Sequence, residues 1–143
     1  MRQRGFFLLL CALAASCASD REGWARRGRY SVLRESALIQ ARRGPQVLDA
    51  RSGELVITWV GARTPAGQPE LSSCELTVFD DLDGDGAPAP GEIRAVRASS
   101  ERARKVLFEE VRARISGAKD LRAVLVASTG RERCAVRWRP APD

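Results

Sequence analysis

The chain has 143 residues, of which 24 are basic and 18 are acidic, and its formal net charge is +6. It contains no histidine, which excludes Ser-His-Asp and Cys-His catalysis and most zinc chemistry. The length is enough for one domain with a hydrophobic core but hardly for two. The basic residues are scattered rather than gathered in one stretch, so we expect no nucleic acid partner.

The N-terminal segment has the pattern of an export signal. Arg2 and Arg4 form a positive start, and the run from Phe6 to Ala15 is apolar. This run is shorter than the roughly 20 residues that span a bilayer, so we expect a cleaved signal rather than a membrane anchor.

A short motif follows the apolar run. The sequence Leu13-Ala14-Ala15-Ser16-Cys17 resembles the lipobox of bacterial lipoproteins, although Ala14 stands where leucine is most common. The resemblance implies a signal peptide over residues 1–16 and a lipidated N-terminal Cys17. The alternative is an ordinary signal peptide cut near Ala18, which would release a soluble secreted or periplasmic protein.

The residues after the lipobox suggest where an anchored protein would reside. Residues 17–28 are polar and charged, as in the tether of a lipoprotein. Ala18 occupies the position where an aspartate tends to retain such proteins at the inner membrane. The resemblance therefore implies an outer-membrane lipoprotein of the bacterial cell envelope, with the membrane as a partner through the lipid.

From residue 29 to residue 143 the pattern predicts a single domain rich in β-strands. Apolar and polar residues alternate with period two in several runs, and turn residues separate these runs. The expected strands are 30–33, 37–40, 45–49 paired with 54–60, 74–79, 93–98, and a hairpin formed by 121–127 and 134–138.

The tryptophans are expected in the core of this domain. Leu55, Ile57 and Trp59 share one face of a strand that we expect to be central, and Trp138 is in phase with other apolar residues. Stacking of Trp59 and Trp138 on sugars is the less favoured alternative.

Two cysteines remain once Cys11 is removed with the signal and Cys17 is lipidated. Cys74 and Cys134 both occupy core-facing phases of predicted strands. Because an exported protein enters an oxidising compartment, we predict a disulfide between them.

One segment has two interpretations. Ala103, Leu107, Val111 and Ile115 are spaced by four, as on a helix, but the same stretch can also be a strand. The predicted fold is therefore mainly β, an Ig-like or prealbumin-like β-sandwich with one inter-strand disulfide. The alternative is an α+β fold with a helix at about 100–115.

Residues 81–92 carry the most specific chemistry in the chain. Asp81, Asp83, Asp85 and Glu92 stand at loop positions 1, 3, 5 and 12, with Gly86 at position 6. Ca²⁺ takes six to eight oxygen ligands, and this spacing can wrap a short chain around it. We predict Ca²⁺ bound by these four carboxylates and by the backbone carbonyl of Ala87.

Two families share features of this loop. It resembles an EF-hand loop, but Pro88 replaces the aliphatic residue at position 8 and the flanks look like strands. The run Phe79–Gly86 followed by Pro90-Gly91-Glu92 is also similar to the calcium loops of secreted bacterial prealbumin-like modules. That resemblance implies an ion that joins two strand ends without switching.

Three functions are compatible with these features. The first is a non-catalytic, lipid-anchored module with a structural Ca²⁺ loop that binds or scaffolds an envelope protein. The second is Ca²⁺-dependent glycan binding, and the third is an EF-hand-like calcium protein. Catalysis by Glu109 and Glu110 is disfavoured, because neighbouring residues diverge on a strand or a helix, and we expect no enzyme.

Overall fold

The structure, a computed structural model, describes residues 38–140. The predicted signal peptide, the tether with Cys17, and the expected strand at 30–33 lie outside this range. Within it the chain forms eight strands and no helix: β1 (Gln40–Arg42), β2 (Gln46–Asp49), β3 (Glu54–Arg63), β4 (Ser73–Asp80), β5 (Ile93–Ser99), β6 (Lys105–Arg114), β7 (Leu121–Ser128) and β8 (Arg133–Trp138).

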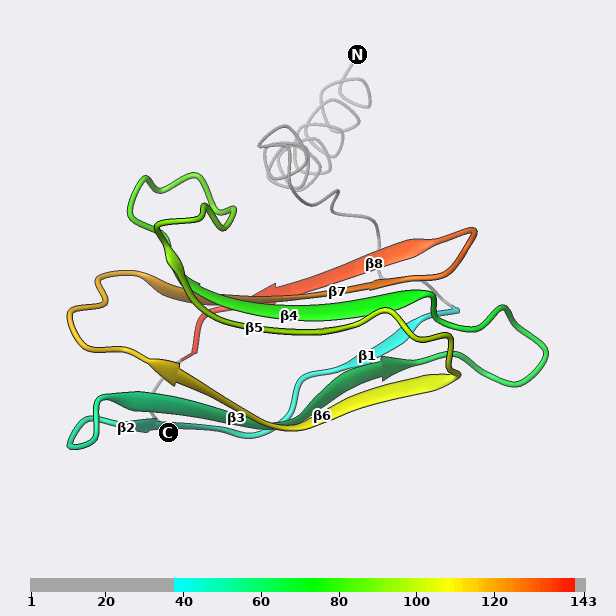
Figure 1. Ribbon diagram of the computed structural model, residues 1–143, viewed down its shortest axis with the longest axis horizontal. Helices are drawn as coiled ribbons and strands as arrows, with labels where there is room; N and C mark the ends of the chain where they lie inside the picture. Colours follow the sequence, from blue (N-terminus) through cyan, green and yellow to red (C-terminus); the bar gives the residue numbers. More distant parts are fainter. Residues whose placement is uncertain (1–37, 141–143) are drawn as a thin grey trace, which may run out of the picture.

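The strands form two antiparallel sheets that face each other as a β-sandwich (Figure 1). In the lower sheet β3 is central, with β6 on one side and with β1 and β2 on the other. The upper sheet has the order β5-β4-β7-β8. The predicted mainly β class is confirmed, as are both predicted hairpins, β2–β3 and β7–β8.

The core lies between the two sheets. Cys74, Leu76 and Val78 of β4 point into it, as their alternation predicted, and so does Trp138 of β8. The Trp138 indole N–H donates to Oε1 of Gln46 at 2.9 Å, so its polar atom is satisfied where the ring is buried. Trp138 is therefore a core residue, as predicted.

The central strand does not keep one phase along its length. Leu55 and Ile57 face the core, but so do Val60 and Ala62, so the buried positions skip from 57 to 60. Trp59 lies at the skip, where its φ is +56° and its side chain is 48 % exposed. The prediction that Trp59 shares the core face of Leu55 and Ile57 is therefore wrong.

Strand β6 changes phase at the same level as β3. Val111 and Ala113 face the core, as do Val106 and the partly buried Phe108, while Glu109 and Glu110 between them are both exposed. The register places Ile57 opposite Val111 and Val60 opposite Phe108, so the two strands skip together. The predicted alternative helix at about 100–115 is wrong, because most of this segment forms strand β6, Lys105–Arg114, and none of it is helical.

Gly44 fits against the backbone where β3 changes phase. A Cβ on Gly44 would lie 1.6 Å from the carbonyl oxygen of Thr58, so no larger residue can occupy this position without movement of the chain. The pairing partner of β3 changes from β1 to β2 around Gly44. The interruption between β1 and β2 therefore makes room for the unusual backbone at Trp59.

The predicted disulfide is wrong, because both cysteines are free and buried. Cys74 of β4 and Cys134 of β8 are both paired with Ala127 of the intervening strand β7. Adjacent strands lie about 4.8 Å apart, so the two Cα atoms are separated by about 10 Å, beyond the roughly 7 Å that a disulfide can span. Burial raises the pKa of the Cys74 thiol to about 12, which keeps it protonated and unreactive.

Replacing Trp59 by glycine should leave a more stable protein than replacing it by alanine. Both changes remove the indole, but the left-handed backbone costs an L-residue about 1–2 kcal/mol that glycine does not incur. At ordinary strand positions the order is reversed, with glycine less stable by about 0.5–1 kcal/mol. Urea unfolding of both variants, with the same pair at Val56 as control, measures the difference. If the alanine variant is at least as stable as the glycine variant, the left-handed backbone at position 59 is not strained.

Candidate metal centre

The acidic loop connects β4 to β5 and rises above the upper sheet (Figure 1). Both flanks of the loop are strands, as predicted, and they pair with each other directly below it. Asp80 N–H donates to the carbonyl of Glu92 at 2.9 Å and closes the base of the loop. The two ends of a 12-residue segment are thus held together by the sheet.

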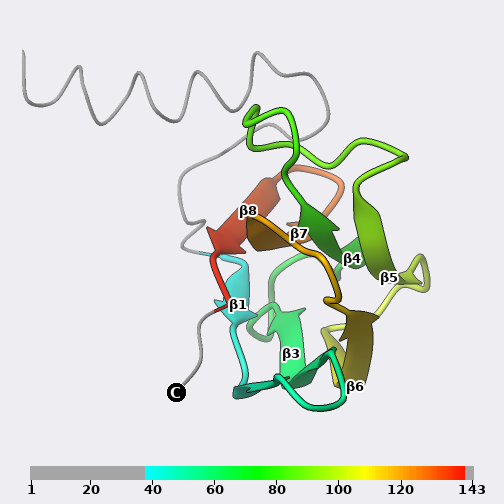
Figure 2. The ribbon, with the colours of Figure 1, turned by 90° about the vertical axis from the view of Figure 1, so that its left-hand side faces the viewer.

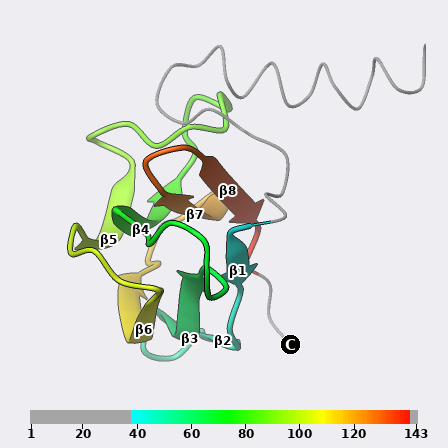
Figure 3. The ribbon, with the colours of Figure 1, turned by 90° about the vertical axis from the view of Figure 1, so that its right-hand side faces the viewer.

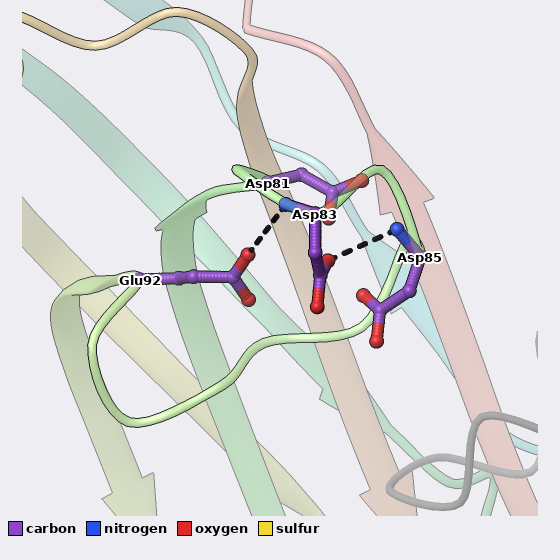
Figure 4. Close-up of side chains that lie close together, drawn as sticks. All are labelled: Asp81, Asp83, Asp85 and Glu92. Atoms are coloured by element: carbon purple, nitrogen blue, oxygen red, sulfur yellow. Dashed lines mark hydrogen bonds between the residues drawn. The ribbon is translucent and has the colours of Figure 1, made fainter.

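Asp81, Asp83, Asp85 and Glu92 converge within the loop (Figure 4). One carboxylate oxygen of each residue can be chosen so that all four lie within 4.8 Å of one another. Ligands on opposite sides of one Ca²⁺ are about 4.8 Å apart, since each bond is about 2.4 Å. The cluster therefore has the size of a coordination shell for one divalent cation.

Backbone N–H groups hold the four side chains in place. Asp83 Oδ1 accepts from Asp85 N at 3.1 Å, and Asp85 Oδ1 accepts from Ala87 N at 2.9 Å. Glu92, at 5 % exposure, reaches across the loop and accepts from Leu82 N at 2.8 Å and from Ala89 N at 2.9 Å. The loop is therefore folded around its own carboxylates.

Asp81 has one oxygen without a partner. It is only 3 % exposed, and its Oδ2 accepts from Gly86 N at 2.9 Å. Its Oδ1 is buried and accepts no hydrogen bond. A buried carboxylate oxygen without a donor is costly, and a cation beside it would remove that cost.

The pKa values of Asp81 and Asp83 move in opposite directions. Burial raises the pKa of Asp81, and the neighbouring Asp83 and Asp85 carboxylates add to this, whereas Gly86 N–H and Arg122 oppose it. The backbone N–H of Asp85 holds the pKa of Asp83 below its usual value. Burial, with a smaller contribution from the neighbouring carboxylates, thus disfavours the ionised form of Asp81, whereas hydrogen bonds favour the ionised form of Asp83.

Four charged residues around the loop were not predicted as site residues from the sequence. Arg122 of β7 lies 3.6 Å from Asp81 Oδ2 and 3.1 Å from Asp120. Asp80, at 1 % exposure, accepts from the backbone N–H groups of Lys119 and Asp120 through Oδ1, and Arg94 lies 3.6 Å from its Oδ2. These contacts tie the loop to the 115–120 turn, and they depend on strand pairing that the local sequence does not reveal.

The other predicted site residues have different positions. Ala87 is buried, and its N–H donates to Asp85, while its predicted role as a carbonyl ligand stays a prediction. Glu109 and Glu110 are both exposed, and Glu110 pairs with Arg112 at 3.1 Å. Gly86 has a φ of +76°, as its predicted role in the sharp turn of the loop requires.

Comparison with known proteins adds no family to this picture. No protein-family model, no curated protein and no solved structure matches the chain. Among residues 38–140 no helix is long and apolar enough to cross a membrane. Only the geometry of the loop and the sequence motifs therefore indicate a function.

In buffer without divalent ions, Asp81→Asn should stabilise the protein at neutral pH. Because the pKa of Asp81 is raised in the folded state, the unfolded chain ionises first, and ionisation weakens the fold as the pH rises above the ordinary value of 3.8. The benefit of asparagine should disappear below that pH. Melting temperatures between about pH 3 and pH 7 in EDTA provide the test.

Asp83→Asn is the matched control, and its effect should have the opposite sign. The lowered pKa of Asp83 means that its ionised form stabilises the fold above pH 3.8, and this contribution is lost as the pH falls through the folded-state pKa. Equal effects of the two substitutions at neutral pH would contradict the assigned environments.

Proposed function

We propose that the chain is a non-catalytic, exported β-sandwich module whose loop 81–92 binds Ca²⁺ as a structural ion. The observation that carries the proposal is the buried, unpartnered Oδ1 of Asp81 within a ring of four carboxylates. Ca²⁺ is favoured over Mg²⁺ because it tolerates a flexible shell of many carboxylate oxygens, whereas Mg²⁺ requires a tight octahedron and retains water.

The ion would act as a staple rather than a switch. The loop joins two strands that are already paired, and Asp80 and Glu92 close its base. An EF-hand sensor instead moves two helices apart when it binds calcium. The strand–loop–strand arrangement supports the resemblance to secreted bacterial prealbumin-like or Ig-like modules over the resemblance to EF-hand proteins.

Glycan binding through the ion is the weaker alternative. Trp138 is buried and donates to Gln46, so it offers no face to a sugar. Trp59 is exposed, but it belongs to the lower sheet, whereas the loop rises from the upper sheet (Figure 1). A ligand held by the loop would therefore not reach an aromatic platform on Trp59.

Calcium should raise the melting temperature of the protein. With a dissociation constant of about 10⁻⁴–10⁻³ M, as in extracellular modules, about 10 mM Ca²⁺ stabilises the fold by about 1.4–2.7 kcal/mol. Asp83→Asn should lose this gain, because it removes one of the four proposed carboxylate ligands. The variant should still fold, because Asp83 is exposed and lies outside the core. Calorimetric melts in Ca²⁺ and in EGTA measure both.

Asp49→Asn is the control for the calcium melt. Like Asp83, Asp49 accepts a hydrogen bond from the backbone N–H two residues ahead, here from Arg51 at 2.9 Å, but it lies at the end of β2, outside the acidic loop. It should retain the full calcium effect. Equal melting temperatures of the parent protein in Ca²⁺ and in EGTA would show that the loop is a solvated turn.

We further propose that Cys17 carries the lipid anchor and that the domain belongs to the cell envelope, facing the periplasm or the surface from the outer membrane. The support is the run of small residues before Cys17 and the apolar segment that precedes it. Several acyl chains give stable anchoring, whereas one chain is marginal. An envelope protein or a glycan would then be the partner.

Metabolic labelling with radioactive palmitate in a bacterial host tests the anchor. The full chain should be labelled, and Cys17→Ser should abolish the label because the acyl acceptor is removed. Cys11→Ser is the control and should leave the label unchanged. Label retained by Cys17→Ser, or absent from the parent chain, would contradict lipidation at this cysteine.

A further inference from the structure

A hollow of about 300 Å³ lies on the outer face of the lower sheet, where β3 runs between β1 and β6. In Figures 2 and 3 this sheet lies below the upper sheet, and the acidic loop stands on the far side of the upper sheet. The hollow is therefore separate from the candidate metal centre. Exposed or half-buried side chains border it, namely those of Gln40 and Arg42 from β1, Arg63 from β3, and Lys105 and Leu107 from β6.

Gly61 leaves space at the centre of this hollow. The strand register places it between Arg42 and Leu107, which are its direct partners on β1 and β6. A Cβ on Gly61 would lie 2.0 Å from the carbonyl oxygen of Val106, so the close approach of β3 and β6 requires glycine here. Position 61 therefore contributes no side chain to the space between Arg42 and Leu107.

Three cations gather at the hollow from three separate strands. Arg63 pairs directly with Lys105 in the strand register, and Arg42 borders the same hollow from β1. Like charges at directly opposed strand positions repel each other. Within residues 38–140, no acidic side chain lines the hollow, and none of the three cations forms an ion pair. An anion bound between them would relieve this repulsion.

The other end of the same sheet carries a cation with its charge balanced. Arg112 of β6 lies 3.1 Å from a carboxylate oxygen of Glu54 and 3.1 Å from one of Glu110. The unbalanced charge around the hollow is therefore not a general property of this sheet.

Gln40 fixes the orientation of Arg63. The Arg63 Nε–H donates to Gln40 Oε1 at 2.8 Å, so the two terminal nitrogens remain as the donors of the planar guanidinium. A guanidinium can donate two hydrogen bonds to one phosphate group, whereas a lysine ammonium acts as a point charge. Leu107 adds a half-buried apolar side chain on the β6 side of the hollow.

We propose that this hollow binds the phosphate group of an organic phosphomonoester. Arg63 donates to two phosphate oxygens, Arg42 and Lys105 offset the remaining charge of the dianion, and Leu107 contacts the carbon atoms of the ester. Membrane lipids and soluble metabolites both carry such a group. The site is independent of the calcium loop, since no residue of the loop takes part in it.

Calorimetric titration of the full chain, purified in a neutral detergent from a bacterial host, tests this proposal. The two probes are glycerol phosphate and dihexanoyl phosphatidic acid, which carry the same phosphomonoester without and with acyl chains. Because the three cations are exposed to water, we expect a dissociation constant of about 0.1–1 mM. Similar affinity for both probes supports the site with a soluble ester as its ligand, and tighter binding of the phosphatidic acid supports it with a membrane lipid.

Substitutions of exposed cations complete the test. Arg63→Gln should weaken binding at least about tenfold, because both phosphate hydrogen bonds are lost. Lys105→Gln should weaken it about threefold, because it removes a point charge alone. Arg51→Gln is the control, since it removes the same charge from an exposed position in the β2–β3 turn, and it should bind like the parent.

Three outcomes would overturn the proposal. The first is that neither probe binds at concentrations up to about 10 mM. The second is that Arg63→Gln binds both probes as the parent does. The third is that Arg51→Gln and Arg63→Gln weaken binding equally, which would mean that only the net charge of the protein attracts the phosphate.

Discussion

Repulsion among four carboxylates within one small volume is the constraint on which the loop and its surroundings depend. Asp81, Asp83, Asp85 and Glu92 could each lower their energy by turning towards water, yet backbone N–H groups of the same loop hold them together. Arg122 offsets part of the charge at Asp81 but bonds to neither of the other two aspartates. We propose that a divalent cation at the centre of the loop offsets the remaining repulsion.

The sandwich provides the rigid base that this loop requires. Antiparallel pairing of β4 with β5 fixes the two ends of the loop, and pairing of β4 with β7 brings the 115–120 turn against Asp80. The buried Asp80 accepts two backbone N–H groups from that turn, so two loops are joined at one end of the upper sheet. An ion in the acidic loop would therefore stabilise a region that spans three strands.

Sequence patterns predicted the features that depend on neighbours in the chain. The hairpin turns, the alternation in β4 and β8, and the loop spacing are local, and the structure agrees with each. The strands β3 and β6 show why alternation failed elsewhere. The core positions are 55, 57, 60 and 62 in β3, and 106, 108, 111 and 113 in β6. Each set has one step of three residues among steps of two, so neither strand keeps the period of two along its whole length.

Features that depend on strand order could not be predicted from the sequence. The phases of Cys74 and Cys134 were correct, but the intervening β7 separates them, and only the order β4-β7-β8 reveals this. Arg122 meets Asp81 because Phe79 pairs with Arg122, a contact across more than 40 residues. The left-handed backbone at Trp59 likewise depends on Gly44 in a neighbouring segment.

The most direct test of the central claim is an anomalous difference map from crystals of the protein grown in Ca²⁺. We expect one strong peak inside the loop, at about 2.3–2.6 Å from oxygens of Asp81, Asp83, Asp85 and Glu92. A map without a peak there, with the four carboxylates turned into solvent, would contradict it.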